Sequence, residues 1–198
     1  ETGKLAAELK HRKIVVAVVF SPNGNWVATA SQDNTARLWD AATGKPLSDP
    51  LKHDDWVNAV SFSSSNSFLA TVSNDKKARL WAAATGKPIG EPLVHDGVVF
   101  SANFSPDEKL LVTTSGNAAR IWEVPSGKPV GEPLKHENGA VSYANFSPDG
   151  KFVVTASGDK TAQVWEAATG KKVGKALTHK DWVNSAEFSP DGRWVLTA

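Results

Sequence analysis

The sequence contains no cysteine among its 198 residues, which excludes disulfide bonds, thiol chemistry and cysteine-rich zinc sites. No apolar run approaches the roughly 18 residues that a membrane-spanning helix requires, and no signal peptide is visible. The formal net charge is only +1, so neither nucleic acid nor a membrane surface would meet a strong field. We therefore expect a cytoplasmic protein without nucleic-acid or membrane partners.

The chain is built from internal repeats. A phenylalanine recurs every 42 residues, and a histidine precedes each by about nine residues. The phenylalanines are Phe20, Phe62, Phe104, Phe146 and Phe188, and the histidines are His11, His53, His95, His136 and His179. The first two repeats are identical at 22 of 42 aligned positions. Such self-similarity indicates a tandem array, whose function is sought on the assembled surface.

Each repeat is predicted to form four β-strands. Apolar and polar residues alternate, β-branched residues are frequent, and turn sequences such as Ser21-Pro22-Asn23-Gly24 separate the runs. No window has the periodicity of an amphipathic helix of ordinary length. A single four-stranded sheet cannot bury both of its apolar faces, so neighbouring units must stack against each other.

The third strand of each complete repeat ends in tryptophan, at Trp39, Trp81, Trp122 and Trp165. With this period and strand number, the chain resembles the WD40-repeat family over its whole length. The Trp-Asp pair itself survives only at Trp39-Asp40, and the glycine that usually precedes the histidine is missing. The resemblance implies an all-β WD40 β-propeller with four-stranded antiparallel blades, of which about 4.5 repeats are present.

The repeats divide the chain into one propeller domain with incomplete ends. Residues 1–10 are expected to form the outer strand of a split blade, followed by repeats at 11–52, 53–94, 95–135 and 136–178 and a partial repeat at 179–198. This division predicts 19 strands, one fewer than five blades need. Three explanations are open: a window from a longer array, an engineered segment, or copies that share strands through open blade edges.

A polar set of His, Ser, Asp and Trp recurs at one register in three repeats. Its members are His11, Ser31, Asp33 and Trp39; His53, Ser73, Asp75 and Trp81; and His136, Ser157, Asp159 and Trp165. A catalytic triad would be unique to one pocket, so the repetition favours a structural role. By resemblance to WD40 proteins, Asp holds His, His contacts Ser, and Ser contacts the indole N–H.

The third repeat departs from this pattern, because Ser115-Gly116-Asn117 lacks the aspartate and stands one residue closer to its tryptophan. We expect an incomplete network there and the most mobile blade. Metal binding is not expected, since the five histidines fall on five different blades. No cofactor is expected either, because no glycine-rich phosphate loop is present.

In WD40 proteins the partner usually docks on the top face. The resemblance places on that face the residues six and four before the repeat phenylalanine, and the residue before the aspartate of the polar set. The residues expected to bind a partner there are Trp56, Trp182, Phe100, Asn58, Asn184, Ile14, Val98, Gln32 and Asn74. Exposed aromatic side chains of this kind dominate many protein interfaces. For Ile14 and Val98, packing between inner strands is the alternative.

These observations predict a non-enzymatic scaffold that binds a protein or peptide through its top face. A second hypothesis is a regulatory or sensor segment of a larger signalling protein that carries a kinase or nucleotide-hydrolysing module. A third is an engineered propeller fragment that self-assembles. A propeller enzyme is the least favoured, because no polar cluster is confined to one blade.

Overall fold

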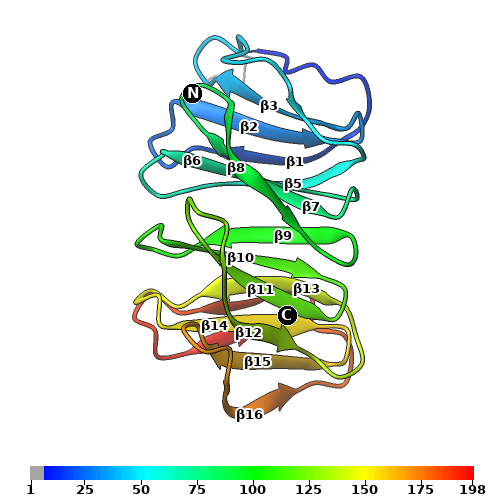
Figure 1. Ribbon diagram of the computed structural model, residues 1–198, viewed down its shortest axis with the longest axis vertical. Helices are drawn as coiled ribbons and strands as arrows, with labels where there is room; N and C mark the ends of the chain where they lie inside the picture. Colours follow the sequence, from blue (N-terminus) through cyan, green and yellow to red (C-terminus); the bar gives the residue numbers. More distant parts are fainter. Residues whose placement is uncertain (1–6) are drawn as a thin grey trace, which may run out of the picture.

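The computed structural model describes residues 7–198. Within this range every regular element is a β-strand and no helix is present. Its 18 strands form four four-stranded antiparallel sheets and one two-stranded sheet. We call each sheet a blade and number the blades along the chain. Figure 1 shows blades 1 to 4 following one another along the long axis of the molecule.

The strands follow chain order within each blade. Blade 1 contains β1 (Val15–Phe20), β2 (Trp26–Ser31), β3 (Thr35–Asp40) and β4 (Leu51–Lys52). Blade 2 contains β5 (Val57–Phe62), β6 (Phe68–Ser73), β7 (Lys77–Ala82) and β8 (Lys87–Val94). Blade 3 contains β9 (Val99–Phe104), β10 (Leu110–Ser115), β11 (Ala118–Glu123) and β12 (Pro129–Lys135). Blade 4 contains β13 (Val141–Phe146), β14 (Phe152–Ser157), β15 (Thr161–Glu166) and β16 (Lys172–Thr178). Blade 5 contains β17 (Ala186–Phe188) and β18 (Val195–Thr197).

The hairpin between the first and second strands shows how local sequence sets the turn. In blade 4, the Ser147 hydroxyl donates to Asp149 Oδ1 at 2.6 Å and accepts the Phe152 N–H at 3.0 Å. Gly150 adopts a φ of +71°, a conformation that costs glycine little. The same arrangement recurs at Ser21 in blade 1 and Ser189 in blade 5. These turns confirm the predicted hairpins and fix the register in which the first and second strands pair.

The core lies between blades rather than within them. Ala28, Ala30 and Leu38 of blade 1 pack against Val57 and Leu69 of blade 2, and matching clusters join the later blades. The first strands of successive blades contact each other from β1 through β5, β9 and β13 to β17. Sheet faces that no single blade could bury are thus covered by stacking.

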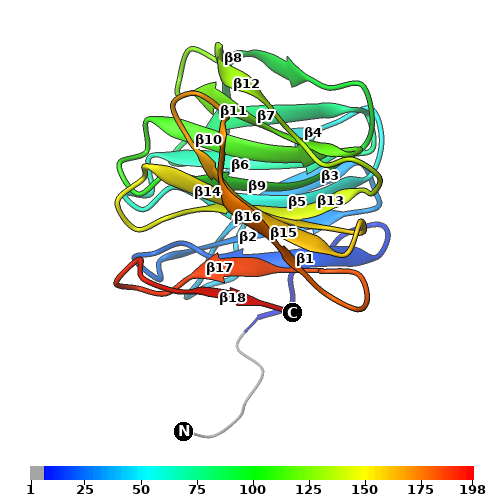
Figure 2. The same cartoon turned by 90° about the horizontal axis from the view of Figure 1, so that it is seen from below.

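The described blades form an arc rather than a closed ring. The β17–β18 hairpin and β1 lie at the same edge of Figure 2, but they lie at different heights in Figure 1. The outer face of β1 therefore remains uncovered: Val18 is 60% exposed, whereas its counterpart Val60 in blade 2 is 6% exposed. Val15 and Phe20 are exposed on the same face.

The predicted outer strand at residues 1–10 is not formed where the structure describes it. Residues 1–6 lie outside the described range, and residues 7–10 are not in a strand. Ala7 and Leu9 nevertheless lie against Gly44, as Leu51 lies against Gly86 in the next blade. The segment thus occupies the place of an outer strand without the pairing, because the described chain supplies no third strand beside it.

Candidate functional site

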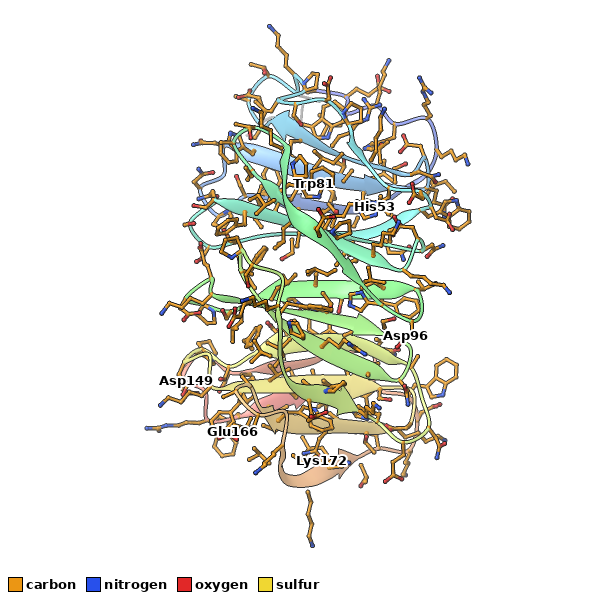
Figure 3. All side chains as sticks on the ribbon, in the orientation of Figure 1. His53, Trp81, Asp96, Asp149, Glu166 and Lys172 are labelled. Carbon is orange, nitrogen blue, oxygen red and sulfur yellow. The ribbon has the colours of Figure 1, made fainter. Side chains whose placement is uncertain are left out.

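A buried threonine joins the histidine and the tryptophan of each complete blade. In blade 2, Thr71 Oγ1 lies 2.8 Å from His53 Nε2 and accepts the Trp81 indole N–H at 2.8 Å. His53 Nδ1 lies 2.9 Å from Asp75 Oδ2. Because a carboxylate only accepts, Nδ1 carries the proton and Nε2 accepts from the threonine hydroxyl. Figure 3 shows His53 and Trp81 on the same blade.

The same chain of hydrogen bonds recurs in blades 1 and 4. The histidine Nδ1 lies 2.9 Å from the aspartate Oδ2 in both, as His11 with Asp33 and His136 with Asp159. The histidine Nε2 lies 2.7 Å from Thr29 in blade 1 and from Thr155 in blade 4. The indole N–H groups of Trp39 and Trp165 complete the two chains.

The prediction that serine joins histidine to tryptophan was wrong for Ser31, Ser73 and Ser157. Val27 pairs directly with Trp39, so Ser31 stands four residues further along its strand, about 13 Å from that point. Thr29 is only two residues from Val27, within diagonal reach of the indole. The serines instead close the neighbouring loop: Ser73 Oγ donates to the Asp55 carbonyl and accepts the Asp75 N–H.

Blade 3 retains the threonine but lacks the carboxylate. Thr113 Oγ1 lies 2.8 Å from His95 Nε2 and accepts the Trp122 indole N–H at 2.8 Å. His95 Nδ1 lies 3.0 Å from the Leu93 carbonyl oxygen, which takes the place of the aspartate. The network is thus reduced by its charged member, while both ring nitrogens of the histidine remain paired.

Burial and charge shift the ionisation of these groups. Burial lowers the pKa of His53, against the opposing effect of the Asp75 carboxylate. Burial works to raise the pKa of Asp75, but the interaction with His53 and the Asp54 N–H outweigh it and lower the pKa. Burial lowers the pKa of His95 to about 4. The histidines of blades 2 and 3 are therefore held neutral near pH 7.

These networks are suited to stability rather than to chemistry. The side chains of Thr71, Thr113 and Thr155 are fully buried, and each hydroxyl already has both a donor and an acceptor beside it. A nucleophile needs an exposed oxygen beside a substrate pocket. The structure places the Ser-His-Asp residue types in one neighbourhood without giving them that arrangement.

A different surface lies at the end of the blades where the loops before each first strand emerge. We call this end the top. In Figure 3, His53 and Asp96 mark it on the right, whereas Asp149 and Glu166 lie at the opposite end. A β-bulge opens the first strand of each of blades 1 to 4 here: in blade 2, Val57 pairs with Ser73 and Ala59 with Val72, which leaves Asn58 unpaired. Bulges commonly redirect a side chain next to a functional site.

The bulged residues form two kinds of contact. Asn58 Nδ2 donates to Asn74 Oδ1 at 2.8 Å and to the Val99 carbonyl at 3.0 Å, which links blades 2 and 3. Ser142 Oγ donates to the Asn184 carbonyl at 3.0 Å and links blades 4 and 5. The bulged residues Val16 and Phe100 are exposed instead. Of the predicted surface residues, Asn58 and Asn74 are thus used within the molecule.

The aromatic candidates at the top end are accessible. Trp56 is 41% exposed and directly precedes β5. Trp182 is 68% exposed and lies in the loop that leads into β17. Ile14 is exposed beside the uncovered face of β1, whereas Val98, Gln32 and Asn74 are half-buried. Large exposed aromatic side chains are typical anchors of protein interfaces.

A cavity of about 500 Å³ lies beside Trp182, between blades 4 and 5. It is lined by Asn138, Gly139, Ala140, Ser142, Gly158, Trp182, Val183 and Asn184. Trp56 and Phe100 do not line it, so the structure brings together only part of the predicted set. Two of the lining residues meet closely, because Gly139 lies against the Gly158–Asp159 backbone and leaves no room there for a side chain.

The sequence reasoning missed several residues of these sites. Thr29, Thr71, Thr113 and Thr155 stand at one register in all four complete repeats, but Ser31, Ser73, Ser115 and Ser157 do so too, and repetition alone does not choose between them. Gly158 stands before Asp159, at a position that the resemblance places on the top face, whereas Gly139 gave no signal, because its importance depends on how two loops of blade 4 approach each other.

Comparison with known proteins agrees with this architecture. The family model described as "WD domain, G-beta repeat" matches residues 3–40, 44–82, 86–123, 127–166 and 170–198. Among curated proteins, the chain is similar to Protein Mut11 of Chlamydomonas reinhardtii, with 59% identity over 34 residues, 17% of this chain and 9% of that protein. Ribosome assembly protein 4 of Saccharomyces cerevisiae is 43% identical over 47 residues, 24% of this chain and 9% of that protein.

Notchless protein homolog of Arabidopsis thaliana is 49% identical over 35 residues, 18% of this chain and 7% of that protein. The matched segments therefore span less than a tenth of each of these relatives. Among residues 7–198 there is no helix of the length and hydropathy needed to span a membrane. The five family matches and the stacked four-stranded blades lead to one conclusion: the chain belongs to the WD40-repeat family.

Proposed function

We propose that the chain is a non-enzymatic scaffold that binds a protein or peptide through its top end, in the cytoplasm. The exposed Trp182 beside its cavity carries the proposal, and Trp56 provides a second exposed anchor. An apolar partner side chain could enter the cavity while its backbone meets the exposed Asn184. The names of the relatives support such a role, because one of them refers to ribosome assembly.

The proposal can be tested with peptides selected on the chain from a displayed random library. We expect selected peptides to bind in the micromolar range, and Trp182→Ala to weaken binding by about tenfold or more. Trp56→Ala is expected to weaken the binding of those peptides that extend to blade 2. Trp194→Ala provides a matched control, because Trp194 is 73% exposed but lies at the hairpin end opposite the top. Equal binding by all three variants would refute the proposal.

A second candidate function, self-association, is favoured by the uncovered face of β1. Val15, Val18 and Phe20 are exposed there, whereas their counterparts in blade 2 pack against blade 1. We propose that a further blade face covers these residues, supplied by a second copy when the chain is alone in solution. Sedimentation should then show a dimer or larger assembly, and Val18→Asp should shift it to monomer. A monomeric wild-type chain would argue against this role.

A further inference from the structure

Blade 4 contains a larger cavity beside its histidine network than blade 3 does. Its volume is about 430 Å³, and His136, Glu137, Asp159, Gln163, Trp165 and Lys172 are among the lining residues. The corresponding cavity of blade 3 has a volume of about 210 Å³ and is lined by Arg120 at the position of Gln163. The two blades differ at one residue of the third strand that lines both cavities, two positions before the tryptophan.

In blades 1 to 3 this position is an arginine. Arg79 Nη2 lies 3.9 Å from Asp54 Oδ2 and 3.7 Å from Asp75 Oδ2. Arg120 Nη2 lies 3.8 Å from Asp96 Oδ2, and the Arg37 guanidinium carbon lies 5.8 Å from the centre of the Trp39 ring. The Nε atoms of Arg37 and Arg79 are buried. The space beside the histidine network is therefore deep enough to bury the inner part of a guanidinium group.

Blade 4 keeps the walls of this space but lacks the arginine. Gln163 is instead held at the cavity wall, because its Nε2 donates to the Val164 carbonyl at 2.7 Å and to the Val173 carbonyl at 3.1 Å. Glu137 follows His136 as Asp54 follows His53, and Asp159 stands where Asp75 stands. The groups that face the guanidinium in blades 1 to 3 are all present around the cavity.

We propose that this cavity binds an arginine side chain of a peptide or protein partner. The guanidinium would lie over the Trp165 ring, as that of Arg37 lies over Trp39, and between the carboxylates of Glu137 and Asp159, as that of Arg79 lies near Asp54 and Asp75. A planar cation that donates several hydrogen bonds suits both an aromatic face and paired carboxylates. An acidic side chain would instead meet the Asp159 carboxylate and the negative face of the indole.

The lysines around the cavity set the strength of this binding. Lys172 Nζ lies 5.5 Å from the centre of the Trp165 ring, which shows that the ring face already receives a cation. In blades 1 to 3 the residue paired with the tryptophan is proline, at Pro46, Pro88 and Pro129. Lys160 Nζ is directed toward blade 5, where it donates to the Lys180 carbonyl at 3.1 Å. An incoming arginine must therefore displace the Lys172 ammonium, and removal of that group should strengthen binding.

The test is a titration of the full chain with acetyl-Gly-Arg-Gly-amide, followed through the assigned indole N–H resonance of Trp165. We expect a saturable shift in the millimolar range and no saturable shift at Trp122, whose blade already contains Arg120. The same peptide with citrulline or glutamate in place of arginine should bind at least about tenfold more weakly. Lys172→Pro should tighten binding several-fold.

Gln163→Arg is the matched variant, because it introduces the side chain that blades 1 to 3 carry. It should abolish the Trp165 response while leaving the indole resonances dispersed as in the folded protein. The proposal is overturned if the glutamate peptide binds as well as the arginine peptide, if the response survives Gln163→Arg, or if no saturable shift occurs at Trp165. Neither Trp56 nor Trp182 takes part, so the outcome is independent of the function proposed for the top end.

Discussion

Blades 2 and 3 bury the same histidine, threonine and tryptophan side chains but hold the histidine with different hydrogen-bond partners. In both, a buried threonine lies between a histidine and an indole N–H. In blade 2 the histidine is held by the Asp75 carboxylate, whereas in blade 3 it is held by the Leu93 carbonyl oxygen. The constant part of the network is thus the threonine, and the aspartate is one of two ways to orient the imidazole.

A hydrogen-bond network can be incomplete because it lacks a charged group or because a polar atom has no partner. Blade 3 has lost a charge, but no ring nitrogen of His95 is left without a partner. A buried polar group without a partner costs far more free energy than one whose partner has been replaced by another. The blade therefore remains a regular four-stranded sheet. The dependence of its stability on pH and on charge should therefore differ from that of blade 2.

The largest effect is expected when the threonine is removed. Thr71→Val and Thr113→Val each leave a histidine nitrogen and an indole N–H without a partner. At about 1–3 kcal/mol for each group, either variant should lose roughly 2–6 kcal/mol of unfolding free energy. Urea unfolding followed by circular dichroism measures the loss. Ser73→Ala is the matched control in blade 2 and should lose less than Thr71→Val. A larger loss for Ser73→Ala would restore the serine as the joining residue.

Acid should destabilise blade 3 through His95. Its pKa is lowered to about 4 in the folded chain, from an ordinary value of 6.5, so the unfolded chain binds the proton first as the pH falls. Stability should therefore decline between pH 6.5 and about 4, by up to about 3 kcal/mol from this group. His95→Gln should flatten this part of the pH profile relative to wild type. An unchanged slope would show that His95 is not held neutral by burial.

Removal of the Asp75 carboxylate tests how much the charged partner of the histidine contributes in blade 2. Asp75→Asn should lose about 1.5–3 kcal/mol, because it removes a charged hydrogen-bond acceptor from a buried imidazole. The stability contributed by Asp75 is present above its ordinary pKa and is lost as the pH falls through its lowered folded pKa. Asp96→Asn is the control in blade 3: its carboxylate is exposed, and the variant should stay within about 0.5 kcal/mol of wild type. Equal losses would mean that the aspartate of the network contributes nothing beyond a surface ion pair.

The smallest expected effect is a difference in local opening. Without a charged contact between the loop after β10 and its histidine, the amides of β11 should exchange with deuterium faster than those of β7. The factor should be several-fold, as measured by hydrogen exchange with mass spectrometry at neutral pH. Equal or slower exchange in β11 would refute the prediction that blade 3 is the most mobile.

The fold was largely predictable from the sequence, because the 42-residue period and the strand alternation repeat five times. The choice between Thr29 and Ser31 was not, since both lie on one face of the same strand and only the pairing of Val27 with Trp39 decides their reach. The predicted outer strand at 1–10 failed over residues 7–10, because a strand needs a partner that periodicity does not guarantee. The cavity at the top end is lined by residues of two blades, and no local pattern reveals how closely their loops approach.

Partner recognition at the top end of the blades is tested most directly by hydrogen exchange with and without a bound peptide from the selected library. Protection is predicted for residues 54–58 and 181–184, which carry Trp56 and Trp182, with no change in the hairpin turns at 63–67 and 189–193. Protection confined to those turns, with the loops at the top end unaffected, would contradict the account.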